Sequence, residues 1–167
     1  VAGHATVKMS DLRRAFEAAG CKSVRTYIQS GNVLFESPAR TAAALTRRIE
    51  ARRLGLLGGR AIVVYRTAHE LQKTAKAAPF KNVRAGAEVK LYVAFLLHEP
   101  RRKPRLPLVS PKEGLEVVAM KGLEAFIVSR KVKRRFGHPN LLIEKELGVP
   151  ATTRNWTTVS KMVELLQ

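Results

Sequence analysis

The sequence contains few of the residues from which catalytic and metal sites are usually built. Among 167 residues it has one cysteine, Cys21, and one aspartate, Asp11, and its four histidines are scattered along the chain. A single cysteine excludes an internal disulfide and suits a reducing compartment. Metal sites need clustered His, Cys, Asp or Glu side chains. The sequence therefore predicts no metal ligand and no cofactor.

Several signatures of enzymes and membrane proteins are also missing. There is no GxxxxGK[ST] phosphate loop and no Gly-x-Ser-x-Gly elbow, and the scarcity of acidic residues argues against two-metal hydrolysis. No apolar run approaches the length of a membrane span, and no secretory signal opens the chain. We expect a cytoplasmic protein, and we name no catalytic residue.

Positive charge is abundant. Lysine and arginine number 31 against 13 acidic residues, which gives a formal net charge of +18 and a pI of about 11.0. A charge of this size favours partners such as nucleic acid, an anionic membrane or another polyanion. A coding bias toward arginine and alanine would give the same composition without any such partner, and both interpretations stay open.

The hydrophobic pattern predicts an α+β fold. Helical periodicity or capping signals mark residues 10–19, 40–53, 67–78, 139–147 and 155–167, and strand patterns mark 24–29, 33–36, 61–65, 89–97, 115–120 and 125–129. Four prolines keep the connection 98–111 extended. With one strand placed before Val1, the first part has the βαββαβ order of a ferredoxin-like unit. We expect this half over residues 1–78 and a second, smaller α+β half over 79–167, packed as one compact unit.

Short motifs predict where helices begin and end. Ser10 and Asn155 are candidate N-caps, and Thr67 and Glu70 have the spacing of a capping box. Pro139 suits the first turn of a helix, and Gly148 suits its C-terminal end.

Basic residues and one tyrosine form the candidate nucleic-acid surface. Arg25, Tyr27 and Gln29 alternate on one face of a strand, where an exposed aromatic ring can stack on bases and arginine can hold phosphate. The runs 101–105 and 130–135 are candidates for phosphate contacts, through Arg101, Arg102, Arg134 and Arg135. The alternatives are a covered strand face with Tyr27 packed inside, and runs that form ordinary solvated surface.

Two polar motifs form a candidate site for an anionic ligand. Ser30, Gly31 and Asn32 lie between two strands, where the simpler interpretation is hairpin-turn chemistry. The second motif precedes the last helix and supplies hydroxyls, a guanidinium and free amides through Thr153, Arg154, Asn155 and Trp156.

The alternative for the second motif is a capped helix start with Trp156 packed in the core. Because a helix N-terminus is already positive, we expect Arg154 to have an anionic partner. The candidates are a bound phosphate, a substrate carboxylate, Glu144 and Glu146.

Two stretches carry a family resemblance: Arg25-Thr26-Tyr27-Ile28-Gln29-Ser30-Gly31-Asn32-Val33 and Gly148-Val149-Pro150-Ala151-Thr152-Thr153-Arg154-Asn155-Trp156. With Val7-Lys8-Met9 and the segment 139–145, the chain resembles the bacterial domain of unknown function 1697 family. The resemblance implies a cytoplasmic bacterial α+β protein and no particular activity. Members begin with a strand ending in a Leu-Arg-Gly-Ile-Asn-like motif. That strand is missing from this chain, and whether the chain is truncated before Val1 stays open. Before Asn140, many members carry a Ser-Lys-Leu-like stretch, whereas this chain has Arg135-Phe136-Gly137-His138-Pro139. Any role of the lysine in that stretch is therefore not assigned to this chain.

These observations leave three hypotheses for function. The first is a non-catalytic protein that binds nucleic acid or another polyanion. The second is a small-molecule or nucleotide-binding protein, or an enzyme, with an anion pocket joining Ser30–Asn32 to Thr153–Asn155. The third is an interaction protein without a ligand, and the oligomeric state stays open.

Overall fold

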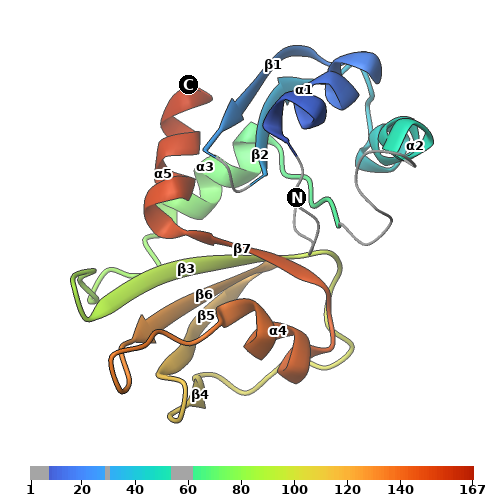
Figure 1. Cartoon of the computed structure of the whole chain (residues 1–167). Coiled ribbons are helices and arrows are strands. Elements are labelled where there is room, and N and C mark those ends of the chain that lie inside the picture. Colours follow the sequence, from blue (N-terminus) through green and yellow to red (C-terminus); the bar gives the residue numbers. More distant parts are fainter. Residues whose placement is uncertain (1–7, 29–30, 54–61) are drawn as a thin grey trace. The chain divides into compact units, whose positions relative to one another are not determined.

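The computed structural model of the chain describes residues 8–28, 31–53 and 62–167 (Figure 1). Contacts divide the chain into unit 1, Val1–Tyr65, and unit 2, Arg66–Gln167. Each unit combines helices with an antiparallel sheet, which confirms the α+β class. The helix predicted over residues 67–78, which we assigned to the first half of the chain, belongs to unit 2.

Unit 1 contains helices α1 (Met9–Ala18) and α2 (Ala42–Arg53) and strands β1 (Lys22–Tyr27) and β2 (Asn32–Glu36). The strands pair antiparallel, with Tyr27 opposite Asn32. Leucine and phenylalanine side chains recur on one face of α1 because residues three and four apart share a helix face. They form a core with both strands and α2, made of Leu12, Phe16, Ala19, Cys21, Val24, Leu45 and Ile49.

Two local predictions in unit 1 are wrong. Ser10 does not cap α1, because the helix begins at Met9, whose side chain packs against the core, and the carbonyl of Lys8 accepts the amides of Asp11 and Leu12. Of the strand predicted over 61–65, Ala61 lies outside the described residues, Ile62 forms a single bridge, and residues 63–65 belong to no strand. Val63 and Tyr65 pack against the core instead, since a β-branched composition favours extended backbone but does not by itself create pairing. The ferredoxin-like order stays a prediction.

Unit 2 is built on a five-stranded antiparallel sheet. Its strands are β3 (Val89–Leu96), β4 (Leu108–Ser110), β5 (Leu115–Lys121), β6 (Glu124–Arg130) and β7 (Ala151–Asn155), in the order β4-β5-β6-β3-β7. Its helices are α3 (Ala68–Lys76), α4 (Pro139–Leu147) and α5 (Trp156–Leu165). β3 is a central strand with long apolar runs because helices cover both faces of the sheet.

Strand alternation divides the core of unit 2 between the two faces. One face packs against α4 through residues such as Ala94, Ile127 and Ile143. On the other face lie α3 and α5, as Figure 1 shows, and Phe126 packs there edge-on against Phe80 and Trp156. Side chains of β7 therefore face α4 or the α3–α5 layer according to their position in the strand.

Most predictions of element ends in unit 2 are confirmed. Thr67 and Glu70 form both bonds of the capping box, Pro139 opens α4, and Gly148 ends it in the left-handed conformation, at φ +63°. The Asn155 side chain accepts the Thr157 amide at 2.9 Å and so caps α5. Strands β4 and β7 lie in segments that the sequence analysis did not assign to strands.

Candidate functional site

Arg154, in the motif that precedes α5, is held inside unit 2. Its Nη1 donates to Thr152 Oγ1 at 2.6 Å and to the Thr153 carbonyl at 2.9 Å. Burial lowers the pKa of the Arg154 guanidinium, which is nevertheless high enough that the group stays charged. Arg154 is thus bonded to the strand that carries it.

The rest of the motif also serves the fold. Thr153 Oγ1 donates to Asn140 Oδ1 at 3.0 Å, and Asn140 Nδ2 donates to Glu144 Oε1 at 2.9 Å. Trp156 lies 5.4 Å from Phe80 between ring centroids.

The register of β7 separates Arg154 from the two carboxylates proposed for it. Thr153 faces α4, and Arg154, the next residue, lies on the opposite face of the sheet. Glu144 and Glu146 belong to α4, so Arg154 and these carboxylates are on opposite sides.

The turn motif of unit 1 is only partly described. Gln29 and Ser30 lie outside the described residues, and Gly31 has φ +77°. Asn32 is buried, and its Nδ2 donates to the Tyr27 carbonyl at 3.0 Å, which closes the turn. Tyr27 is half-buried and Arg25 is exposed.

Cys21 of unit 1 is buried in the core of that unit. Burial raises its pKa, against the lowering effects of Arg48 and of a hydrogen bond with Ser37. The buried thiol therefore acts as a small core residue.

The first basic run of unit 2 follows β3. Arg101, Arg102, Lys103 and Arg105 are all exposed. In the part of the chain that the structure describes, none of them forms an ion pair. Prolines keep this connection extended without placing its cations in a regular element.

The second basic run forms a tight hairpin turn after β6. Val132 and Arg135 exchange backbone hydrogen bonds of 2.8 and 2.9 Å, and the two residues between them, Lys133 and Arg134, have φ of +46° and +66°. Positive φ at both central residues defines a type I′ turn, which usually carries Asn-Gly. We call residues 130–136 the basic turn.

Backbone contacts at both ends hold the basic turn in place. The Arg130 amide donates to the Gly114 carbonyl at 2.7 Å, and the Lys131 amide donates to the Glu88 carbonyl at 3.0 Å. A Cβ at Gly114 would lie 2.1 Å from the Arg130 carbonyl oxygen, and one at Gly137 would lie 2.6 Å from the Glu113 carbonyl oxygen. Only glycine allows these approaches, so the neighbouring loop fixes where the turn lies.

The charges of the basic turn are unevenly compensated. Arg130 pairs with Glu116 at 3.0 Å, and Lys131 pairs with Glu88 at 3.5 Å. The exposed residues Lys133, Arg134 and Arg135 form no ion pair with any carboxylate that the structure describes.

An aromatic ring adjoins these cations. The ammonium of Lys90 lies 4.4 Å from the centroid of the Phe136 ring, and that of Lys131 lies 5.6 Å from it. Cations at these distances are attracted to the ring face. Phe136 therefore gathers two lysines beside the turn.

The two basic runs leave the sheet at opposite ends of β3. Val89, at the start of β3, pairs with Arg130, whereas the run 101–105 follows Leu96, at the end of the strand. The sequence analysis grouped these runs as one surface, and the topology makes them separate candidates.

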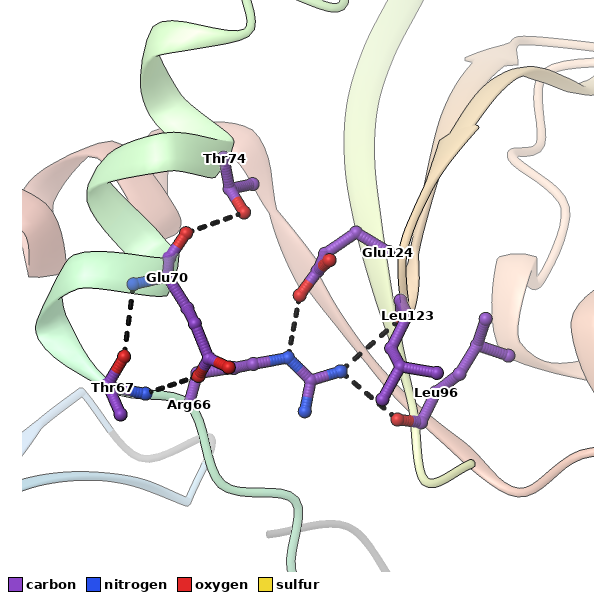
Figure 2. A network of polar contacts seen from close by, with 7 residues as sticks. All are labelled: Arg66, Thr67, Glu70, Thr74, Leu96, Leu123 and Glu124. Carbon is purple, nitrogen blue, oxygen red and sulfur yellow. Dashed lines mark hydrogen bonds and ion pairs between the residues drawn. The ribbon is translucent and has the colours of Figure 1, made fainter. Parts of the chain in front are cut away.

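Figure 2 shows a polar network in which the Thr67–Glu70 capping box was predicted from the sequence and the contacts of Arg66 were not. Arg66 Nε donates to Glu124 Oε1 at 2.6 Å, and Arg66 Nη2 donates to the carbonyls of Leu96 and Leu123 at 3.1 and 3.3 Å. Both charged side chains are nearly buried, at 11% and 12% exposure. The pair spans 58 positions, so no local pattern indicates it.

Within the described ranges 8–28, 31–53 and 62–167, no three His, Cys, Asp or Glu residues come together to hold a metal ion. Nor does this part of the chain form a helix with the length and apolar character needed to cross a bilayer.

These features define a strongly basic α+β protein in which three consecutive exposed cations, Lys133, Arg134 and Arg135, lie on a hairpin turn. Residues 1–126 match the model of the family described as "Protein of unknown function (DUF1697)", and the chain belongs to this family. The family resemblance seen in the sequence is thereby confirmed. Comparisons with curated proteins and with solved structures give no match.

Proposed function

We propose that the protein binds nucleic acid without catalysing a reaction, and that the cations of unit 2 contact the phosphates. The observation that carries the proposal is the basic turn, where Lys133, Arg134 and Arg135 are consecutive, exposed and unpaired with any described carboxylate. Phosphate contacts by lysine and arginine provide most of the sequence-independent affinity for nucleic acid.

The alternative, a small-molecule or nucleotide site around Thr153–Trp156, has less support. Hydroxyl, guanidinium and amide groups of this motif are already bonded within unit 2, and Trp156 packs against other rings. Fewer of their hydrogen-bonding atoms are therefore available to a ligand.

The test measures binding of the full chain to a labelled polyuridine RNA by fluorescence anisotropy over a range of salt concentrations. We expect log K to fall steeply with log salt, by about 0.7 for each phosphate neutralised on a single strand. Reversal of Arg101, Arg102, Arg134 and Arg135 to glutamate should flatten this slope.

A matched control reverses four exposed lysines outside both runs, namely Lys81, Lys121, Lys145 and Lys161. It changes the net charge equally, so a slope that stays steeper than in the first variant supports local phosphate contacts. Absence of binding by the wild type at low salt would overturn the proposal, as would equal slopes in the two variants.

A further inference from the structure

The two central residues of the basic turn have a backbone conformation that residues other than glycine rarely adopt. Lys133 and Arg134 both occupy the left-handed region, at φ +46° and +66°, although neither has the conformational freedom of glycine. Asn-Gly is the preferred pair at these two positions of a type I′ turn. A strained conformation that surrounding contacts maintain is typical of functional segments.

The surroundings do maintain it. Glycines at 114 and 137 allow close backbone approach on either side, and the amides of Arg130 and Lys131 are bonded to neighbouring loops. The hairpin is therefore rigid before any ligand arrives. Prior ordering of the backbone that carries the cations lowers the entropy cost of binding a nucleic-acid strand.

We infer that Lys133 and Arg134 are the main phosphate-binding pair of this protein, contacting neighbouring phosphates of one nucleic-acid strand. This inference rests on the proposed function and locates its main phosphate contacts at the basic turn. The two-residue hairpin holds both side chains at its tip, exposed and without a described acidic partner. Lys90, which lies beside the Phe136 ring, adds positive potential near them.

Run 101–105 serves as the internal comparison because it has the same kinds of exposed cation without a hairpin. Its residues lie in a proline-rich connection, and no backbone exchange of the Val132–Arg135 kind is formed among them in the described structure. Ordering the backbone of this run on a nucleic-acid strand therefore costs more conformational entropy. It should therefore contribute less to affinity than the turn.

The decisive variant carries Lys133→Asn together with Arg134→Gly. We expect its melting temperature to rise, because Asn-Gly suits the turn, while its affinity for polyuridine RNA at low salt falls on the order of tenfold. A second variant, Lys133→Gln with Arg134→Gln, removes the same charge without supplying glycine. It should lose similar affinity with no gain in melting temperature.

The control variant carries Arg101→Asn with Arg102→Gly, which makes the same replacements in the other run. It should keep most of the wild-type affinity. If the wild type binds RNA and the two turn variants bind equally well, the inference fails while the proposed function stands. If the control loses as much affinity as the turn variants, the turn has no special role and the inference is overturned. If the wild type does not bind RNA at all, the proposed function itself has failed.

Discussion

Two groups of arginines in unit 2 differ in their surroundings although the sequence does not distinguish them. Arg66 and Arg154 donate hydrogen bonds to groups of their own unit, and Arg66 does so beside a nearly buried carboxylate. Arg101, Arg102, Arg134 and Arg135 are exposed and form no ion pair among the described residues. The first group stabilises the fold, and the second group is available to a polyanion.

The difference teaches how to interpret a polar motif in a chain with few acids. Thirteen acidic residues cannot pair with 31 cations, so most cations must lie at the surface without a carboxylate. The arginine that looked most like a ligand-binding group, in the Thr-Thr-Arg-Asn-Trp motif, is bonded to its own strand. The run 130–135, for which the sequence left phosphate contacts and ordinary solvated surface as alternatives, forms an ordered turn.

The largest effect that follows from this comparison concerns the Arg66–Glu124 pair. Glu124→Ala leaves a nearly buried guanidinium without its carboxylate, and removal of one partner from a buried pair costs about 3–5 kcal/mol. We expect a loss of this size in the free energy of unfolding, measured by urea denaturation.

Glu88→Ala is the matched control because it breaks the 3.5 Å pair with Lys131, in which the glutamate side chain is 73% exposed. Exposed pairs contribute about 1 kcal/mol or less. Equal losses in the two variants would show that Arg66 belongs with the surface arginines, and the division into two groups would then be wrong.

A smaller effect is expected at Arg154. Arg154→Ala removes two hydrogen bonds from a charged donor, and we expect a loss of about 1–3 kcal/mol of stability with unchanged binding to RNA. Arg154→Lys should recover little, because an ammonium does not reproduce the geometry of the guanidinium. If the Arg154→Ala variant keeps wild-type stability and binds RNA more weakly, Arg154 belongs with the arginines that are available to a polyanion.

Sequence patterns predict the parts of this molecule that depend on neighbours along the chain. The capping box at Thr67 and Glu70, the start of α4 at Pro139 and the hairpin of β5 and β6 all arise from residues close in sequence. The signals that predict them are local hydrogen-bonding groups and short-range periodicity, and both can be recognised in the sequence alone.

Features that depend on contacts between residues far apart in the sequence were not predicted. Strand β7 is paired with β3, about sixty positions earlier, and its polar composition resembles a loop as much as a strand. The Arg66–Glu124 contact has the same origin. The basic turn is local but was still missed as a turn, because Lys133 and Arg134 replace the Asn-Gly signal that normally predicts positive φ.

The smallest effect on stability is expected in the run 101–105. Arg101 and Arg102 are exposed in a connection between strands, and neither forms an ion pair with a carboxylate in the described part of the chain. Surface substitutions of this kind change stability by about 0.5 kcal/mol or less, so Arg101→Ala with Arg102→Ala should unfold at nearly the wild-type urea concentration. Its affinity for RNA should fall less than that of the Lys133 and Arg134 variants, because the backbone of this run is not held in a hairpin before RNA binds. A clear loss of stability would mean that this run makes structural contacts. Exposure of an arginine would then not show that it is available to a polyanion.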